Sequence, residues 1–176
     1  MPFRRAALHA AATIGFRQRG MQFLLANDAN FARSNGSTSL DTAAFNGHTD
    51  LVRMLLEKGE NMEATRINDG LTPLHTAVYY GHSGVVRLLL EKGANIERSD
   101  GRPTALYVAS CFAHVGVVRL LLEKAANIEV TKLKDRRTAL HGAALYLQTE
   151  AVRLLLGTYM RRPSKRRRRY MIKKLK

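Results

Sequence analysis

The sequence contains one cysteine, no tryptophan and only four prolines among its 176 residues. The single Cys111 excludes an internal disulfide bond, and an unpaired thiol is typical of a reducing compartment. No apolar run approaches the roughly 18 residues that a membrane-spanning helix needs. We also find no glycine-rich phosphate loop, nucleophile elbow or paired-acid motif. These absences favour an intracellular protein, cytoplasmic or nuclear, that is not an enzyme and binds no cofactor.

Positive charge is distributed unevenly along the chain. The 29 Lys and Arg residues exceed the 14 Asp and Glu residues, which gives a net charge of +15. Residues 161–176 contain ten of the basic residues and no acidic residue. This segment lacks an apolar periodicity long enough to fold, so we expect residues 159–176 to form a disordered basic tail.

Internal repetition is the strongest signal in the sequence. Four segments align on their threonines, which are Thr38, Thr72, Thr104 and Thr138. A divergent fifth copy, ALHAAATIGFRQRGMQFLLANDANF, lies near the N-terminus. A period of 20–50 residues predicts a stack of helical units, each too small to bury its own apolar face alone.

The repeated positions also predict where helices begin and end. Each threonine can cap a short first helix by accepting a hydrogen bond from a backbone N–H, and Pro73 suits the first helical position. Glycines such as Gly47 and Gly81 should end that helix in the left-handed conformation. Ala113 and Leu147 replace this glycine in the last two repeats, where they should be strained.

The segment Thr72-Pro73-Leu74-His75-Thr76-Ala77 resembles the signature of the ankyrin-repeat family, and the resemblance covers residues 6–156. It implies an all-α fold, a short α-solenoid of about five helix-turn-helix repeats joined by hairpin loops. The array should span residues 1–158. Its expected units are 6–34, 35–68, 69–99, 100–133 and 134–158.

The six histidines could suggest a metal site, but each occupies a repeated position. His75 and His141 follow the leucine of the first helix, and His82 and His114 follow the helix terminator. Side chains spread one or two to a unit cannot converge on one zinc ion, which needs three or four ligands at about 2 Å. We therefore expect them to hydrogen-bond within and between units, and expect no metal.

In ankyrin-like proteins the partner usually contacts the hairpin tips and the exposed, concave face of the first helices. On that face an aromatic ladder is expected, formed by Phe45, Tyr79, Tyr80, Phe112 and Tyr146. At the hairpin edge the corresponding basic residues are Arg66, Arg98 and Arg102. The ladder could instead pack inward between units, and the basic edge could be a solvated surface rather than a means of attracting an acidic partner.

The predicted function is therefore that of a monomeric adaptor or scaffold that binds a protein partner, and the chain has no predicted membrane span. The alternative is a nuclear or nucleic-acid-associated regulatory protein that acts through its tail. In that case import or phosphate contact would depend on Lys165, Arg166, Arg167, Arg168 and Arg169. The two hypotheses differ in salt dependence, because phosphate contacts weaken steeply with salt.

Overall fold

The computed structural model describes residues 38–66, 69–98, 102–131 and 137–161. Within these residues the chain forms eight α-helices, arranged as four helix pairs, and no β-strand. This confirms the predicted all-α solenoid class. The chain divides into two compact units, residues 1–100 and 101–176, which are described separately. The predicted first repeat, 6–34, and the cluster Lys165–Arg169 lie outside the described residues.

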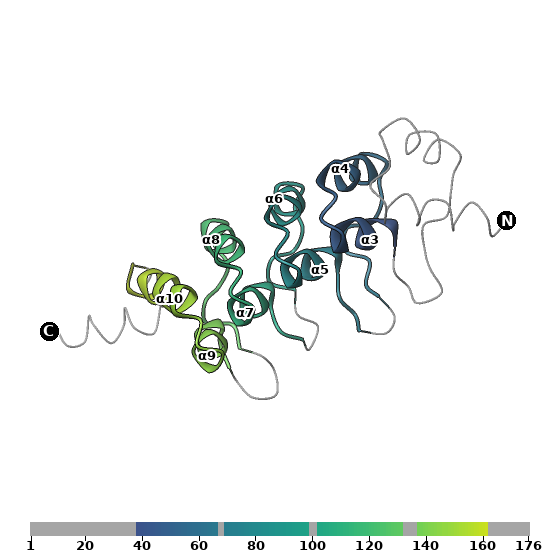
Figure 1. Ribbon diagram of the computed structural model, residues 1–176. Helices are drawn as coiled ribbons and strands as arrows, with labels where there is room; N and C mark the ends of the chain where they lie inside the picture. The colour runs from purple at the N-terminus through teal and green to yellow at the C-terminus, as the bar shows by residue number, and fades with distance from the viewer. Residues whose placement is uncertain (1–37, 67–68, 99–101, 132–136, 162–176) are drawn as a thin grey trace, which may run out of the picture. The chain divides into compact units, whose positions relative to one another are not determined.

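The first compact unit contains two helix pairs. Helices α3 (Ser39–Phe45) and α4 (Thr49–Glu57) form one pair, and α5 (Pro73–Tyr79) and α6 (Ser83–Glu91) form the next. Helix α3 packs against α5, and α4 packs against α6 (Figure 1). Small and branched side chains fill the space between them. The largest fully buried ones are Leu40, Val52, Leu55, Leu74, Val78, Val85, Val86 and Leu89.

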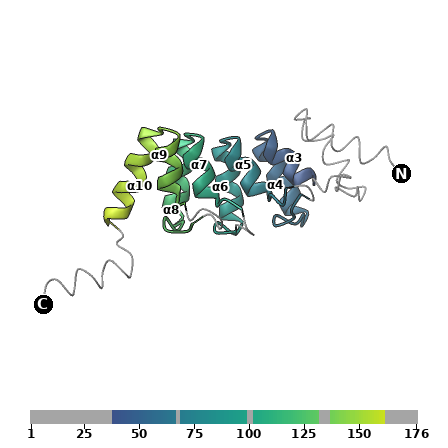
Figure 2. The ribbon, with the colours of Figure 1, turned by 90° about the horizontal axis from the view of Figure 1, so that it is seen from below.

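The second compact unit repeats this arrangement. It consists of α7 (Ala105–Cys111), α8 (Val115–Glu123), α9 (Ala139–Leu145) and α10 (Thr149–Arg161). The first helices, α7 and α9, pack side by side, as do α8 and α10 (Figures 1 and 2). Ala109 and Ala143 are fully buried, which lets the two first helices approach closely.

The N-termini of the first helices follow the prediction. Thr38, Thr72 and Thr104 each accept a hydrogen bond from the backbone N–H three residues later, at 3.1, 3.4 and 3.3 Å. The imidazole Nδ1 of His75 lies 2.8 Å from the hydroxyl of Thr72, so this histidine supports the cap.

The turn after each first helix has the same backbone geometry whether or not its central residue is glycine. Gly47 and Gly81 both have φ of +74°, and Ala113 and Leu147 have φ of +57° and +56°. The following N–H closes each turn, for example from His114 to the Ala109 carbonyl at 3.1 Å. The predicted strain is therefore present at both non-glycine positions, where it costs about 1–2 kcal/mol each.

The last helix is longer than its counterparts. Helix α10 continues to Arg161, whereas the other second helices end after nine residues. Residues 159–161, which the sequence analysis assigned to the tail, are therefore helical. The hydroxyl of Thr158 donates to the Leu154 carbonyl at 2.9 Å. The repeat aligns Tyr159 with the left-handed glycines Gly59 and Gly93. Because this position of α10 has no glycine, no turn signal ends the helix there.

Candidate interaction surface

Large apolar side chains are exposed at the C-terminal ends of the first helices. Phe45 and Tyr79 close α3 and α5, and Tyr80 follows α5 as its C-cap residue. Their exposed fractions are 43%, 43% and 44%. A helix of seven residues buries the side chains at its centre, so these positions in the last turn point away from the inter-helix core.

Phe45, Tyr79 and Tyr80 form one group, which we call the aromatic cluster. The ring centroids of Phe45 and Tyr80 are 4.5 Å apart at 61°, and those of Tyr79 and Tyr80 are 5.0 Å apart at 68°. These are edge-to-face arrangements, worth about 0.5–1.5 kcal/mol each beyond the area they bury. The structure thus brings three of the five predicted aromatic residues together around Tyr80, and all three remain partly exposed.

His82 contacts two members of the aromatic cluster. Its Nε2 lies 2.9 Å from the carbonyl oxygen of Phe45, and since a carbonyl can only accept, Nε2 carries the proton. The imidazole also stacks against Tyr80 at 6.3 Å and 19°. This position of the imidazole depends on Gly47, because a Cβ at residue 47 would lie 2.7 Å from Nδ1 of His82. The cluster is therefore supported by fixed contacts before any partner binds.

The second compact unit exposes the two residues equivalent to Tyr80, whereas Cys111, at the position of Phe45 and Tyr79, is buried. Phe112 is 48% exposed and stacks against His114 at 6.2 Å, and Tyr146 is 57% exposed. Leu145 and Leu147 flank Tyr146 and are 56% and 87% exposed. The sequence analysis did not select these two leucines as site residues. The signal that could have identified Leu147 is its place in a glycine position, where the side chain projects from a tight turn.

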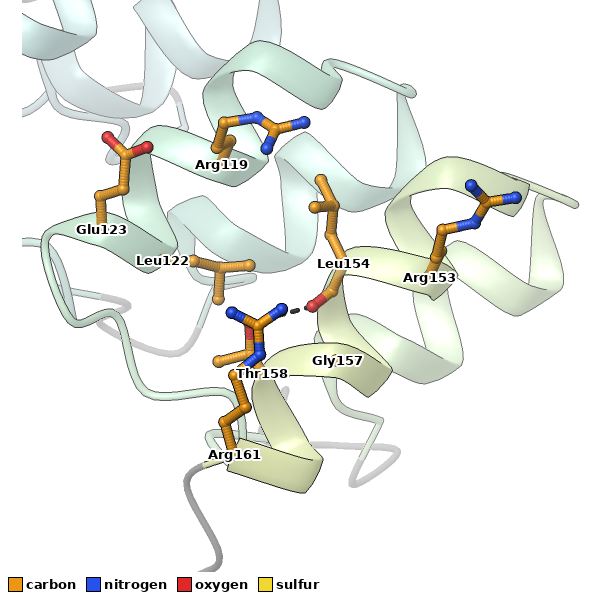
Figure 3. A pocket seen from close by; sticks show the side chains of 8 residues that line it. All are labelled: Arg119, Leu122, Glu123, Arg153, Leu154, Gly157, Thr158 and Arg161. Carbon is orange, nitrogen blue, oxygen red and sulfur yellow. Dashed lines mark hydrogen bonds between the residues drawn. The ribbon is translucent and has the colours of Figure 1, made fainter.

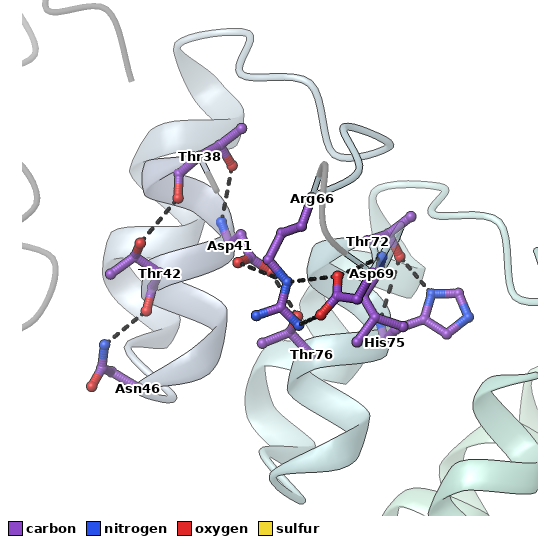
Figure 4. Close-up of polar contacts among 10 residues, drawn as sticks. Thr38, Asp41, Thr42, Asn46, Arg66, Asp69, Thr72, His75 and Thr76 are labelled. Atoms are coloured by element: carbon purple, nitrogen blue, oxygen red, sulfur yellow. Dashed lines mark hydrogen bonds and ion pairs between the residues drawn. The ribbon is translucent and has the colours of Figure 1, made fainter. Parts of the chain in front are cut away.

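Two of the predicted hairpin arginines are engaged inside the first compact unit. Arg66 forms a bidentate pair with Asp69, with Nη2 2.9 Å from Oδ2 and Nε 3.1 Å from Oδ1. Its Nε also lies 3.7 Å from the buried Asp41, which accepts a hydrogen bond from Thr76 at 2.7 Å (Figure 4). Arg66 therefore connects its hairpin to α3, and Asp41 in turn connects α3 to α5.

Arg98 has a similar role in the next hairpin. Its Nη1 donates to the Glu63 carbonyl at 2.9 Å and lies 3.1 Å from the Glu63 carboxylate. The same carboxylate accepts the backbone N–H of Asn95 at 2.9 Å. The side chains of Arg66 and Arg98 are only 22% and 28% exposed. Arg102, two residues before the Thr104 cap of α7, is also half-buried. The charges of Arg66 and Arg98 are therefore largely used within the fold.

Glu60 carries the one pKa shift that stands out in the described part of the chain. Burial of its carboxyl group raises the pKa to about 7, and the backbone N–H groups of Leu40 and Ser39 offset only part of this effect. Neither carboxylate oxygen has a partner of good hydrogen-bonding geometry among the described residues. The equivalent residues in the next two repeats are the buried Ala94 and Ala126.

A family model described as ankyrin repeats matches the chain over residues 2–66, 60–132 and 101–166. The three matches cover nearly the whole array, and the paired helices with threonine caps agree with them. The chain belongs to the ankyrin-repeat family. No individual curated protein matches it. The first match includes residues 6–34, where the sequence analysis placed the divergent repeat.

Ankyrin repeats generally mediate protein–protein interaction and are typically non-enzymatic modules. In the described ranges, no group of His, Cys, Asp and Glu side chains is arranged to hold a metal ion. Among the helices described, none is long and apolar enough to cross a membrane. Cys111 is buried, and a Cβ at Gly142 would lie 2.8 Å from its sulfur, so this thiol packs within the repeat interface.

Proposed function

We propose that this ankyrin-repeat protein is a non-enzymatic adaptor that binds a protein partner through exposed residues at the ends of its first helices. The observation that carries the proposal is the aromatic cluster of Phe45, Tyr79 and Tyr80. The ring of Tyr80 contacts those of Phe45 and Tyr79, and all three residues are more than two-fifths exposed. Exposed apolar groups gathered in one place are typical of interaction sites.

Two physical properties of the aromatic cluster favour binding, namely its large apolar area and its restricted motion. Aromatic side chains bring a large apolar surface with few rotatable bonds, so little conformational entropy is lost when they are covered. The His82 contacts reduce this loss further by fixing Tyr80 and the backbone of Phe45. Binding hot spots are enriched in tyrosine for these reasons. Phe112 and Tyr146 would add contacts from the second compact unit.

The charges of the hairpins have a secondary place in this proposal. Because Arg66 and Arg98 pair with acidic residues of the fold, they contribute to the position of the hairpins rather than to a free basic surface. Attraction of an acidic partner would then depend on Arg102 and on the net charge of +15. Such long-range attraction mainly increases the association rate.

The decisive experiment compares two variants in affinity purification and then with the identified partner in purified form. Tyr79→Ala combined with Tyr80→Ala should weaken binding by more than about 2 kcal/mol, or about thirtyfold. The control is Leu156→Ala on α10, whose side chain is equally exposed at 44% but lies on a second helix. A folded double variant that binds its partner as the unmodified protein does would refute the proposal.

A second candidate role is favoured by the ten Lys and Arg residues in positions 161–176. A segment of this composition suits nuclear import or contact with nucleic-acid phosphates. Binding through it should fall by orders of magnitude between low and physiological salt. Binding through the aromatic cluster should change little over the same range. Titration at two salt concentrations, with and without residues 162–176, therefore separates the two roles.

A further inference from the structure

A groove lies between α8 and α10 in the second compact unit, on the side formed by the second helices. Its volume is about 480 Å³, which is within the range of ligand-sized clefts (Figure 3). Leu122 and Leu154 provide its apolar surface, and Gly157 lies between Leu154 and the end of α10. The groove is separate from the ends of the first helices, where the aromatic cluster and its equivalents lie.

The rim of the groove is strongly basic. Arg119, Arg153 and Arg161 line it together with a single acidic residue, Glu123. All three arginines are exposed, so their charges are available to a ligand. Among the described residues, Arg153 pairs with Glu150 at 3.7 Å, and this ion pair is weak because the two side chains are 79% and 57% exposed.

The corresponding residues of the other repeats show how this groove differs from them. The repeat aligns Gly157 with Glu57, Glu91 and Glu123, and it aligns Arg161 with Asn95. Helix α10 has therefore exchanged an acidic residue for glycine and gained an arginine one turn later. A Cβ at Gly157 would lie 4.0 Å from the guanidinium of Arg161, so a side chain at position 157 would meet that arginine.

We propose that this groove binds an acidic segment of another protein, one that presents carboxylates to the arginines and an apolar side chain to Leu122 and Leu154. Three guanidinium groups around an apolar floor match a short helix with acidic and leucine-like residues at helical spacing. This second-helix site is independent of the adaptor surface proposed above, and its partner can differ from the one bound there.

Charge excludes two other occupants of the groove. The segment that follows Arg161 contains nine basic residues and no acidic residue in positions 162–176, so the arginines would repel it. A second copy of the chain carries a net charge of +15 and would be repelled in the same way. Nucleic acid is disfavoured for another reason, because the lining residues include no aromatic ring on which a base could stack.

The test uses the full chain and a fluorescein-labelled peptide of Glu and Leu residues at helical spacing, with binding followed by anisotropy. Gly157→Glu restores the residue of the other repeats and places a carboxylate between Arg153 and Arg161, each four positions away. We expect it to weaken binding at least about tenfold. Replacing a helical glycine should also stabilise α10, so loss of folding would not explain the effect.

Two matched variants isolate the cause. Gly157→Gln adds a side chain of the same size without charge. Gly116→Glu makes the same substitution at an exposed position of α8 where the next repeat has Glu150, outside the groove. Both should bind within about threefold of the unmodified protein. The Tyr79→Ala and Tyr80→Ala variant should bind the peptide normally, which separates this site from the adaptor surface.

Several results would overturn the proposal. No measurable binding of the peptide to the unmodified chain would do so. An equal loss in Gly116→Glu would mean that the peptide responds only to net charge, and an equal loss in Gly157→Gln would mean that charge at this position is irrelevant. Binding of a single-stranded oligonucleotide with the same dependence on Gly157 would replace the acidic peptide by nucleic acid as the occupant.

Discussion

Replacement of Glu60 by alanine should stabilise the protein at pH 8 by about 3 kcal/mol. Burial raises the pKa of this carboxyl group from 4.5 to about 7, and each pKa unit corresponds to about 1.4 kcal/mol. The substitution has a natural precedent in the chain, because Ala94 and Ala126 occupy the same buried position in the next two repeats. Their backbone turns are also equivalent, with the N–H of Glu60 and of Ala94 bonded to Leu55 and Leu89 at 3.1 and 3.0 Å.

The sign of the pH dependence follows from the direction of the pKa shift. Because the folded protein holds the Glu60 proton more tightly than the unfolded chain, this group stabilises the fold fully below about pH 4.5. That stability is lost as the pH rises to about 7, and the loss is complete above it. Glu60→Ala should therefore differ most from the unmodified protein at pH 8 and differ least near pH 4.5.

The assay is denaturant unfolding of both proteins at several pH values between 4.5 and 8.5, followed by far-UV circular dichroism. Contributions from other titrating groups cancel in the difference between the two proteins. Glu60→Gln should also stabilise at pH 8, since it mimics the protonated side chain. Glu57→Ala, an exposed carboxylate on α4, should change the stability at pH 8 by less than about 0.5 kcal/mol. Destabilisation by Glu60→Ala at pH 8, or a difference that does not vary with pH, would refute the reasoning.

Three further outcomes are expected. Ala113→Gly should raise the free energy of unfolding by about 1 kcal/mol, because φ at this position is +57°. Hydrogen exchange of backbone amides should show lower protection in residues 102–161 than in 38–98, and uniform protection would contradict this expectation. Arg98→Gln should lower the free energy of unfolding by about 1–2 kcal/mol, since Glu63 loses its partner at 3.1 Å. An unchanged midpoint of denaturant unfolding would mean that the contacts between Arg98 and Glu63 do not stabilise the fold. Residues 159–176 fused to a cytoplasmic reporter should direct it at least partly to the nucleus through Lys165–Arg169, as fluorescence microscopy would show, and a reporter that stays cytoplasmic would exclude import by this segment.

Features that repeat along the chain could be predicted from the sequence alone. The threonine caps and the left-handed Ala113 and Leu147 depend on local backbone geometry, which the repeat imposes on every unit. Phe45, Tyr79 and Tyr80 are exposed, as the resemblance to ankyrin-repeat proteins implied. Whether they bind a partner stays a prediction.

Features that break the repeat were harder to predict. Arg98 pairs with Glu63 at a separation of 35 residues, and nothing in the local sequence indicates which acidic residue it meets. The basic hairpin edge was therefore expected to be freer than it is. Glu60 stands where later repeats have alanine, but only the structure shows that the carboxyl group is buried. The groove depends on Gly157 and on the extension of α10 to Arg161, which the sequence analysis assigned to the tail.

The contact between Gly47 and His82 limits how such repeats can be rearranged during evolution. A histidine after the turn of one repeat requires glycine in the turn of the repeat before it, since a Cβ at Gly47 would overlap the imidazole at 2.7 Å. In the last two described repeats both residues of this pair are changed. Ala113 replaces the glycine, and Gln148 replaces the histidine of the next repeat. Duplication or exchange of a single repeat would often break this pairing. Successful recombination should therefore transfer adjacent repeats together, and Gln148→His should be tolerated only when Ala113→Gly accompanies it.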